Sequence, residues 1–333
     1  MTYRLILILS LLFLSFDASA DEASYAIEEN GCSCGCSSGD SCSCARNARA
    51  LAWRHEHHHA NTLHAFTHGC RGVWFPEDPP LFRPPIADPR QLNYSVGWRF
   101  DDSVVAKNVI PISFYDSLIL YRFCDVGSCH GQLDISIDGG LWGVFSPLHE
   151  DTPLVNTDYY VGVPVCYSFG CWAFRLRVFH VSSHLGDEFL VLNPDFDRRN
   201  PSAEYADFFV SYQLTPDIRV YGGAGWLVAQ DETFRCGSWY AEGGAEVKLQ
   251  GYRYVSCKDM LYGLPFLAIH YRQKPEFKRH IDMTYMAGYE IGKLCGLCRN
   301  IRAYVQYHDG YSLEGQFCRE PTNYFGIGLS HGY

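Results

Sequence analysis

Over most of its length the chain alternates apolar and polar side chains in stretches of about ten residues. In residues 132–145, for example, Ile135 and Ile137 fall on one face of an extended chain, and Asp134 and Asp138 fall on the other. A water-soluble antiparallel sheet alternates in the same way. Here, however, so many segments carry charged groups on the second face that no apolar core is left for a soluble protein. The pattern therefore predicts the inverse arrangement, a transmembrane β-barrel with lipid outside and a polar lumen.

We count twelve alternating segments, and an even number is typical of bacterial barrels. We therefore expect an all-β fold, a twelve-stranded antiparallel barrel that begins and ends in the periplasm. Periplasmic turns should be tight and outer loops long, with residues 250–262 as the exception. The aromatic last residue, Tyr333, resembles the assembly signal of Gram-negative outer-membrane barrels. The predicted strands are 92–101, 109–122, 132–146, 158–168, 171–184, 204–214, 217–229, 238–249, 263–272, 280–291, 299–309 and 322–333.

The N-terminus has the form of a secretory signal peptide. Arg4 precedes an apolar run over residues 5–16, and Ala18-Ser19-Ala20 offers a small-residue cleavage site. The run is too short to span a bilayer, and no later segment has the ~18 uninterrupted apolar residues of a transmembrane helix. We expect cleavage after Ala20 and export. The formal net charge of −10 argues against a nucleic-acid partner.

Composition divides the rest of the chain into two regions. After the signal peptide, residues 1–20, we expect a periplasmic extension over residues 21–91, followed by the barrel over residues 92–333. The extension is rich in Cys and His at first and becomes a proline-rich linker between Pro76 and Pro89. The Cys/His-rich part has no amphipathic period, so we expect it to be disordered.

The chain has 15 cysteines, which in an exported protein indicate disulfide bonds. On the predicted topology most barrel cysteines fall at the periplasmic end, on the same side as the extension. We expect these thiols to form disulfides within the chain or with neighbouring envelope proteins, and since 15 is odd, at least one thiol is free or intermolecular. Those at the periplasmic end are Cys124, Cys129, Cys166, Cys171, Cys257, Cys295 and Cys298, and the two in outer loops are Cys236 and Cys318.

Histidines cluster in the extension, at His55, His57, His58 and His59. They could hold zinc or copper, because imidazole suits both ions. The paired Cys-x-x-Cys spacing of a structural zinc site is absent from the sequence, and an oxidising compartment favours disulfides over thiolate ligands. Metal binding by these histidines remains an open alternative, and we predict no other cofactor.

Four segments resemble one family, which is known only as a domain of unknown function, DUF1207. The resemblance covers roughly residues 75–333 and implies an outer-membrane barrel without an established reaction. The sequence differs from the usual pattern at Val181, where relatives carry Gln, and at Leu313-Glu314, where they carry Pro-Asn. The four segments are Ile86-Ala-Asp-Pro-Arg90, Asp158-Tyr-Tyr-Val-Gly162, Phe179-His-Val-Ser-Ser-His-Leu-Gly-Asp-Glu-Phe189 and Ser312-Leu-Glu-Gly-Gln-Phe317.

One of these segments contains a candidate catalytic pair. His180 and Ser182 are two residues apart on the predicted strand 171–184, so they share its lipid-facing side. A histidine beside a serine can remove the hydroxyl proton and activate the oxygen as a nucleophile. Glu188 or Asp187, just beyond the strand, could orient the imidazole.

The His-x-Ser pair resembles the arrangement in outer-membrane phospholipase A and in the outer-membrane lipid A deacylases. Ser183 stands where those enzymes carry Asn. The alternative is that the strand has reached the lipid headgroup zone, where polar side chains such as His184 are ordinary. The resemblance implies a serine-type lipid acyl hydrolase.

Charged residues are predicted to line the lumen and to pair across it. A barrel of twelve strands is too narrow for a wide pore, so structural ion pairing is favoured over transport. The leading expectation is a structural outer-membrane protein tied into a disulfide network, with outer-membrane lipid and envelope proteins as partners. A lipid hydrolase and a narrow channel are the alternatives. The predicted lumenal residues are Asp134, Asp138, Asp207, Glu242, Glu246, Asp282 and Glu290, with Arg175, Arg177, Arg219, Lys248 and Arg302.

Overall fold

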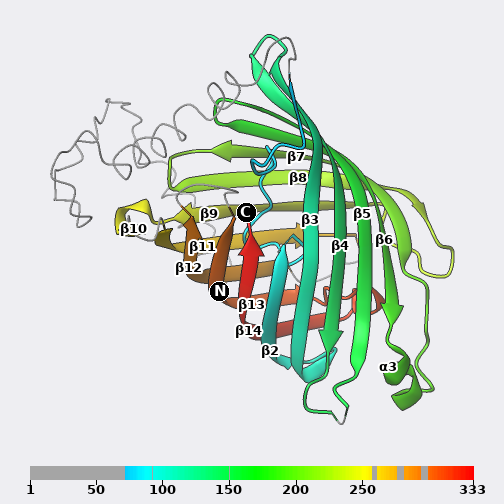
Figure 1. The fold of residues 1–333 in the computed structure, drawn as a ribbon. Coiled ribbons are helices and arrows are strands. Elements are labelled where there is room, and N and C mark those ends of the chain that lie inside the picture. The colour runs from blue at the N-terminus through cyan, green and yellow to red at the C-terminus, as the bar shows by residue number, and fades with distance from the viewer. Residues whose placement is uncertain (1–71, 92, 150, 257–260, 276–280, 294–298) are drawn as a thin grey trace. The chain divides into compact units, whose positions relative to one another are not determined.

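Twelve antiparallel strands form a closed barrel (Figure 1). The computed structural model describes residues 72–333 except 92, 150, 257–260, 276–280 and 294–298. Each barrel strand pairs with the next, and the first strand, β2, pairs with the last, β14, which closes the ring. The strands are β2 (Tyr94–Asp102), β3 (Ala106–Val126), β4 (Gly131–Phe145), β5 (Leu154–Phe169), β6 (Trp172–Leu185), β7 (Ser202–Gln213), β8 (Ile218–Gln230), β9 (Trp239–Lys248), β11 (Leu261–Gln273), β12 (Asp282–Lys293), β13 (Asn300–Tyr311) and β14 (Pro321–Gly332).

The predicted fold class is thereby confirmed, and every predicted segment corresponds to one strand. Two short strands extend the sheet: β1 (Gly72–Trp74) pairs with β3, and β10 (Tyr254–Ser256) pairs with β11. The described residues also form three short helical segments, α3 (Asp187–Leu192), η1 (Gln250–Tyr252) and η2 (Gly315–Phe317). Among the described residues, no helix has the length and apolar character needed to cross a bilayer.

The two ends of the barrel differ in their connections. We call the end that carries Tyr94 and Tyr333 the terminal end, and the opposite end the loop end. At the terminal end, β5 and β6 are joined by a two-residue turn at 170–171. At the loop end, residues 186–201 between β6 and β7 contain α3 (Figure 1). The connection from β9 to β11 is the long exception at the terminal end, as predicted.

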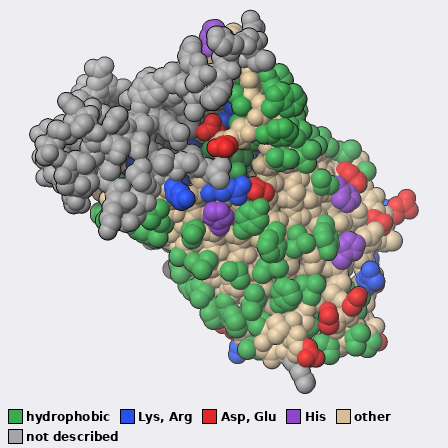
Figure 2. Space-filling view, viewed as in Figure 1, with side chains coloured by type: hydrophobic (Ala, Val, Ile, Leu, Met, Phe, Trp, Pro, Cys, Tyr) green, Lys and Arg blue, Asp and Glu red, His purple; other side chains and the backbone are tan. Residues whose placement is uncertain are grey.

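Apolar side chains cover the outside of the wall (Figure 2). On β14, Phe325, Ile327 and Leu329 are exposed, while the residues between them, Gly326 and Gly328, lie on the inner face. Aromatic rings also meet across strands on this surface, as Tyr285 does with Tyr307. An apolar, aromatic-rich outer wall around a closed sheet is the surface that a bilayer requires.

Ion pairs brace the inside of the barrel. The predicted inward acids and bases lie there, and the sequence analysis missed three further bases, Arg99, Arg122 and Arg272. Because lumenal charges are largely removed from water, pairing is what makes their burial tolerable. The pairs include Arg122–Asp134, Arg177–Asp207, Arg219–Glu246, Arg272–Asp282, Lys248–Glu290 and Arg302–Glu290.

Residues 76–91 run through the lumen rather than forming a linker beside the barrel. The backbone N–H groups of Leu81 and Ile86 donate to lumenal carboxylates of the wall, at 3.1 Å and 2.6 Å. In return, Arg122 donates to the carbonyl of Pro79 at 2.8 Å. These contacts satisfy an irregular backbone at membrane depth, which is tolerated only where protein surrounds it. We call residues 76–91 the lumenal segment.

The loop between β13 and β14 folds inward at the loop end. Its Glu314 accepts hydrogen bonds from Arg99 at 2.8 Å and from the Ser312 hydroxyl at 2.7 Å. Burial by itself would raise the pKa of the Glu314 carboxyl, but the Arg99 and Arg90 guanidinium groups and these hydrogen bonds lower the pKa to about 2. The loop is therefore held to the wall by an ionised carboxylate.

Replacing Arg122 by Ala should lower the free energy of unfolding by about 3–5 kcal/mol, because the fully buried Asp134 carboxylate loses its partner. Equilibrium unfolding of the barrel in urea measures this change. The control is Arg199→Ala, whose pair with Asp197 is exposed and should contribute no more than about 1 kcal/mol. Equal losses in the two variants would contradict the assignment.

Stability should also fall on acidification through Glu314. Because folding lowers the pKa of this carboxyl, its contribution is present above pH 4.5 and is lost as the pH falls towards 2. Urea unfolding at a series of pH values measures the slope, which Glu314→Gln should reduce. Glu320→Gln, at an exposed position of the same loop, should leave the slope unchanged. A slope that persists in Glu314→Gln would count against this role.

Candidate functional site

Strand β6 presents the predicted catalytic pair on the outer wall. Its alternation is regular: Leu176 and Val178 are exposed, whereas Arg175 and Arg177 are buried in the lumen. His180 and Ser182 continue the exposed row and are both partly accessible. The two residues therefore share the outer face of one strand, as the spacing predicted. Both residues lie close to the β6–β7 connection and therefore near the loop end of the wall.

A carboxylate on the neighbouring strand contacts the histidine. In the register of β6 with β7, His180 lies opposite Glu204 and Ser182 lies opposite Ser202. His180 Nδ1 donates to Glu204 Oε1 at 2.8 Å, and the two side chains are 37% and 42% exposed. With the proton held on Nδ1, Nε2 of the neutral ring is left as the acceptor. Glu204 thus gives the imidazole the tautomer that a general base needs.

The acids suggested by the sequence for this role lie elsewhere. Asp187 and Glu188 are exposed in the first turn of α3, and neither contacts His180. Glu204 is 24 residues from His180 along the chain, so sequence proximity could not indicate it. Only a register that pairs β6 with β7 brings the two side chains together.

The Ser182 hydroxyl makes no hydrogen bond with His180 or with any other described residue. Residues i and i+2 of a strand are about 6.6 Å apart along the chain and project from the same face. The spacing therefore places the Ser182 hydroxyl on the same side of the sheet as His180, and catalytic hydrogen bonds are often loose before substrate binds. On the neighbouring strand β5, Tyr159 lies opposite Ser182, and its ring is 5.7 Å from the ring of His184.

Ser183 points the opposite way, into the lumen. Its hydroxyl donates to Asn156 Oδ1 at 3.0 Å, and Asn156 Nδ2 donates to Asp158 Oδ1 at 2.8 Å. Asp158 also accepts from the backbone N–H of Gly315 at 3.1 Å. A Cβ at residue 315 would lie 2.5 Å from the Ser183 Cβ, so only glycine allows this approach. The position after the candidate nucleophile therefore serves the interior of the barrel.

The four segments that carry the family resemblance meet at this point. Arg90 of the lumenal segment donates to Asp158 and to the carbonyl of Leu313. Gln316 donates to the carbonyl of Ser183 at 3.1 Å. Beside these contacts is a lumenal cavity of about 170 Å³, which Arg90, Asp158, Ser183 and Leu313 help to line. The lumenal segment and the inward loop together occupy the barrel, which does not favour the narrow-channel alternative.

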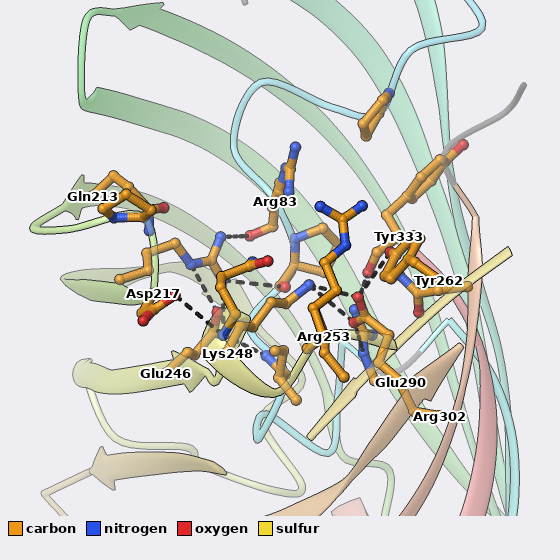
Figure 3. A pocket seen from close by; sticks show the side chains of 18 of the residues that line it. Arg83, Gln213, Asp217, Glu246, Lys248, Arg253, Tyr262, Glu290, Arg302 and Tyr333 are labelled. Carbon is orange, nitrogen blue, oxygen red and sulfur yellow. Dashed lines mark hydrogen bonds and ion pairs between the residues drawn. The ribbon is translucent and has the colours of Figure 1, made fainter. Parts of the chain in front are cut away.

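A second cavity, of about 150 Å³, opens near the terminal end (Figure 3). Glu290 is its central acid and accepts from Lys248 at 2.9 Å and Arg302 at 2.8 Å. In Figure 3, Arg83 and Arg253 point into the same part of the pocket. The buried Nε of Arg253 has no hydrogen-bond partner among the described residues. Bases outnumber acids in this lining, so the terminal end of the lumen is electropositive.

Part of the predicted thiol and metal chemistry lies outside the described residues. This holds for His55, His57, His58 and His59, for the N-terminal cysteines, and for Cys257, Cys295 and Cys298. No disulfide joins any two of the described thiols Cys124, Cys129, Cys166, Cys171 and Cys236. Cys129 and Cys171 are exposed at the terminal end, whereas Cys166 is buried against the lumenal segment. The predicted disulfide network therefore stays a prediction.

Solved structures resemble the chain in fold alone. The outer membrane phospholipase A from Escherichia coli has a TM-score of 0.47 at 11% identity, over 73% of this chain and 92% of that one. The β domain of the Bordetella autotransporter BrkA has a TM-score of 0.41 at 13% identity, covering 72% and 97%. LpxR from Salmonella typhimurium has a TM-score of 0.36 at 11% identity, covering 72% and 99%. Identities this low carry no information about activity.

No curated protein matches the chain. A family model does match it, over residues 51–333, and its description is "Protein of unknown function (DUF1207)". The match spans the barrel, the lumenal segment and the four segments that meet around Asp158. The chain therefore belongs to the DUF1207 family.

Proposed function

We propose that this outer-membrane-type barrel is a serine-type lipid acyl hydrolase whose reacting groups lie on the lipid-facing wall. Ser182 is the nucleophile, His180 is the general base, and Glu204 orients and stabilises the histidine. The observation that carries the proposal is the 2.8 Å hydrogen bond from His180 Nδ1 to Glu204, on the same exposed row as Ser182. A base held by an acid beside a hydroxyl is the arrangement that activates serine in unrelated hydrolases.

The position of the site supports acyl esters of membrane lipids as the substrate class. Between His180 and the terminal end the wall is apolar, with Val178 and Leu176 exposed on the same row of β6. An acyl chain lying along this row would present its ester bond at the height of Ser182. We further propose that the barrel lies in the outer membrane, with its terminal end and the N-terminal extension in the periplasm.

The reaction would proceed through an acyl-enzyme. The Ser182 hydroxyl attacks the ester carbonyl carbon while His180 Nε2 takes its proton, and Glu204 stabilises the imidazolium that forms. The imidazolium then returns the proton to the departing alcohol of the lipid. Water, deprotonated by His180, attacks the acyl-serine bond, and fatty acid is released with Ser182 restored.

A purely structural envelope role is the second candidate. It is favoured by the packed lumen and by Cys129 and Cys171, whose exposed thiols at the terminal end could form disulfides with neighbouring proteins. A structural barrel needs no reactive serine. Chemistry at Ser182 therefore separates the two candidates.

Ser182→Ala should abolish labelling by a fluorophosphonate and reduce hydrolysis of phospholipid in mixed micelles by at least about 100-fold. The matched control is Ser202→Ala, which removes the serine directly opposite on the same face of the sheet. It should keep both labelling and activity. Labelling that survives in Ser182→Ala, or a native barrel that neither labels nor hydrolyses lipid, would refute the hydrolase and leave the structural role.

Glu204→Gln should lower kcat by about 100-fold with little change in KM, because the glutamine cannot stabilise the imidazolium. Glu188→Gln should leave kcat unchanged, since Glu188 is exposed on α3 and does not contact His180. Steady-state kinetics of both variants measures the difference. A loss in Glu188→Gln with none in Glu204→Gln would reverse the assignment of the orienting acid.

A further inference from the structure

Two carboxylates and an imidazole meet inside the lumen, away from the outer wall. Asp88, Glu242 and His270 each bring one potential ligand atom, and these atoms lie within 4.8 Å of one another. Asp88 and His270 are 4% and 3% exposed. Asp88 and Glu242 also line the lumenal cavity of about 170 Å³. The three residues come from the lumenal segment, β9 and β11.

The wall residues are set by the pairing of β9 with β11. His270 lies opposite Gly244 in this register, and Glu242 is the next inward residue of β9. The Tyr221 hydroxyl is 2.9 Å from His270 Nδ1. A Cβ at residue 244 would lie 2.3 Å from that hydroxyl, so the glycine makes room for the tyrosine. With Nδ1 engaged, Nε2 is left without a hydrogen-bond partner among the described residues.

The Asp88 carboxylate is positioned by its own segment. It accepts from the backbone N–H of Arg90 at 2.9 Å and from the Gln91 side chain at 2.6 Å. Gln91 is itself fixed by Arg175, which donates to its Oε1 at 2.9 Å. Both donors to Asp88 are neutral amides, so each carboxylate oxygen keeps a free lone pair and the negative charge is not cancelled. Hydrogen bonds of this kind are what orient metal-binding carboxylates in proteins.

Two cations, Arg272 and Lys274, lie near Glu242, and Arg272 is opposite it in the β9–β11 register. The Glu242 carboxylate, however, forms no ion pair or hydrogen bond with a described residue. The nearby Arg272 donates instead to Asp282 Oδ2, at 2.6 Å. Lys274 lines the same cavity but forms no ion pair with Asp88 or Glu242. Two adjacent carboxylates in a largely desolvated site call for a bound cation or a bound proton.

We propose that Asp88, Glu242 and His270 Nε2 bind a divalent first-row metal ion. A mixed set of carboxylates and one imidazole suits such ions. The ion cancels the paired negative charge, and it joins the lumenal segment to β9 and β11. This site is independent of the lipid chemistry on the outer wall and of the histidines of the N-terminal extension.

The test is a titration of the metal-free, full-length protein in detergent with Mn²⁺. Binding is measured as the loss of the free Mn²⁺ signal in electron paramagnetic resonance. Mn²⁺ is chosen because it favours carboxylates over thiolates and imidazole, so the cysteines and the N-terminal histidines compete poorly for it. One equivalent should bind to the wild-type chain. Asp88→Asn, Glu242→Gln and His270→Gln should each weaken binding at least about tenfold.

The matched control is Asp138→Asn, which removes one inward carboxylate that accepts from Tyr115 and is not part of the cluster. It should bind Mn²⁺ as the wild type does. Heat-dependent migration on gels confirms that each variant has folded. If the wild type binds no stoichiometric Mn²⁺, or if Asp88→Asn and Asp138→Asn bind equally, the cluster holds a proton instead and the metal site is refuted.

Discussion

The structure depends on one constraint: a backbone surrounded by lipid must hydrogen-bond to itself. Only a closed sheet meets this condition with strands, because any open edge would leave N–H and C=O groups unpaired in hydrocarbon. The pairing of β2 with β14 supplies the closure. Once the sheet is closed, the period of two along each strand assigns alternate side chains to lipid and to the lumen. The apolar outer wall and the charged interior are both consequences of this closure.

A charged interior creates a second demand, since each buried charge needs a partner. Ion pairs such as Arg177 with Asp207 meet it across neighbouring strands. The lumenal segment meets it along the axis, where its backbone N–H groups and carbonyls bond to wall residues such as Asp134 and Arg219. At the Asp88–Glu242–His270 cluster, neither carboxylate forms an ion pair with a described residue. The proposed metal ion would compensate their charge by the same electrostatic rule.

The outer and inner faces of β6 illustrate how one strand serves two purposes. His180 and Ser182 point outward from the wall, whereas Ser183 points inward, to the contacts around Asp158. A hydrolytic site on the wall would therefore be supported from behind by the contacts among the four family segments. The sequence analysis identified the histidine and the serine from their spacing, but it proposed Glu188 as the orienting acid. Glu204 takes that position because β7 returns beside β6 in a register that spacing along the chain does not reveal.

The sequence by itself determined the twelve barrel strands, the two faces of each and most of the charges inside, because a period of two is a local property that each strand carries alone. It also indicated His180 and Ser182, which are two residues apart. The tertiary structure decided which strands are neighbours at which register, and so brought Glu204 to His180 and Glu242 to His270. It also decided that a proline-rich stretch without periodicity fills the lumen. Such contacts join residues far apart in the chain, and they exist only once the closed sheet fixes the distance between its walls.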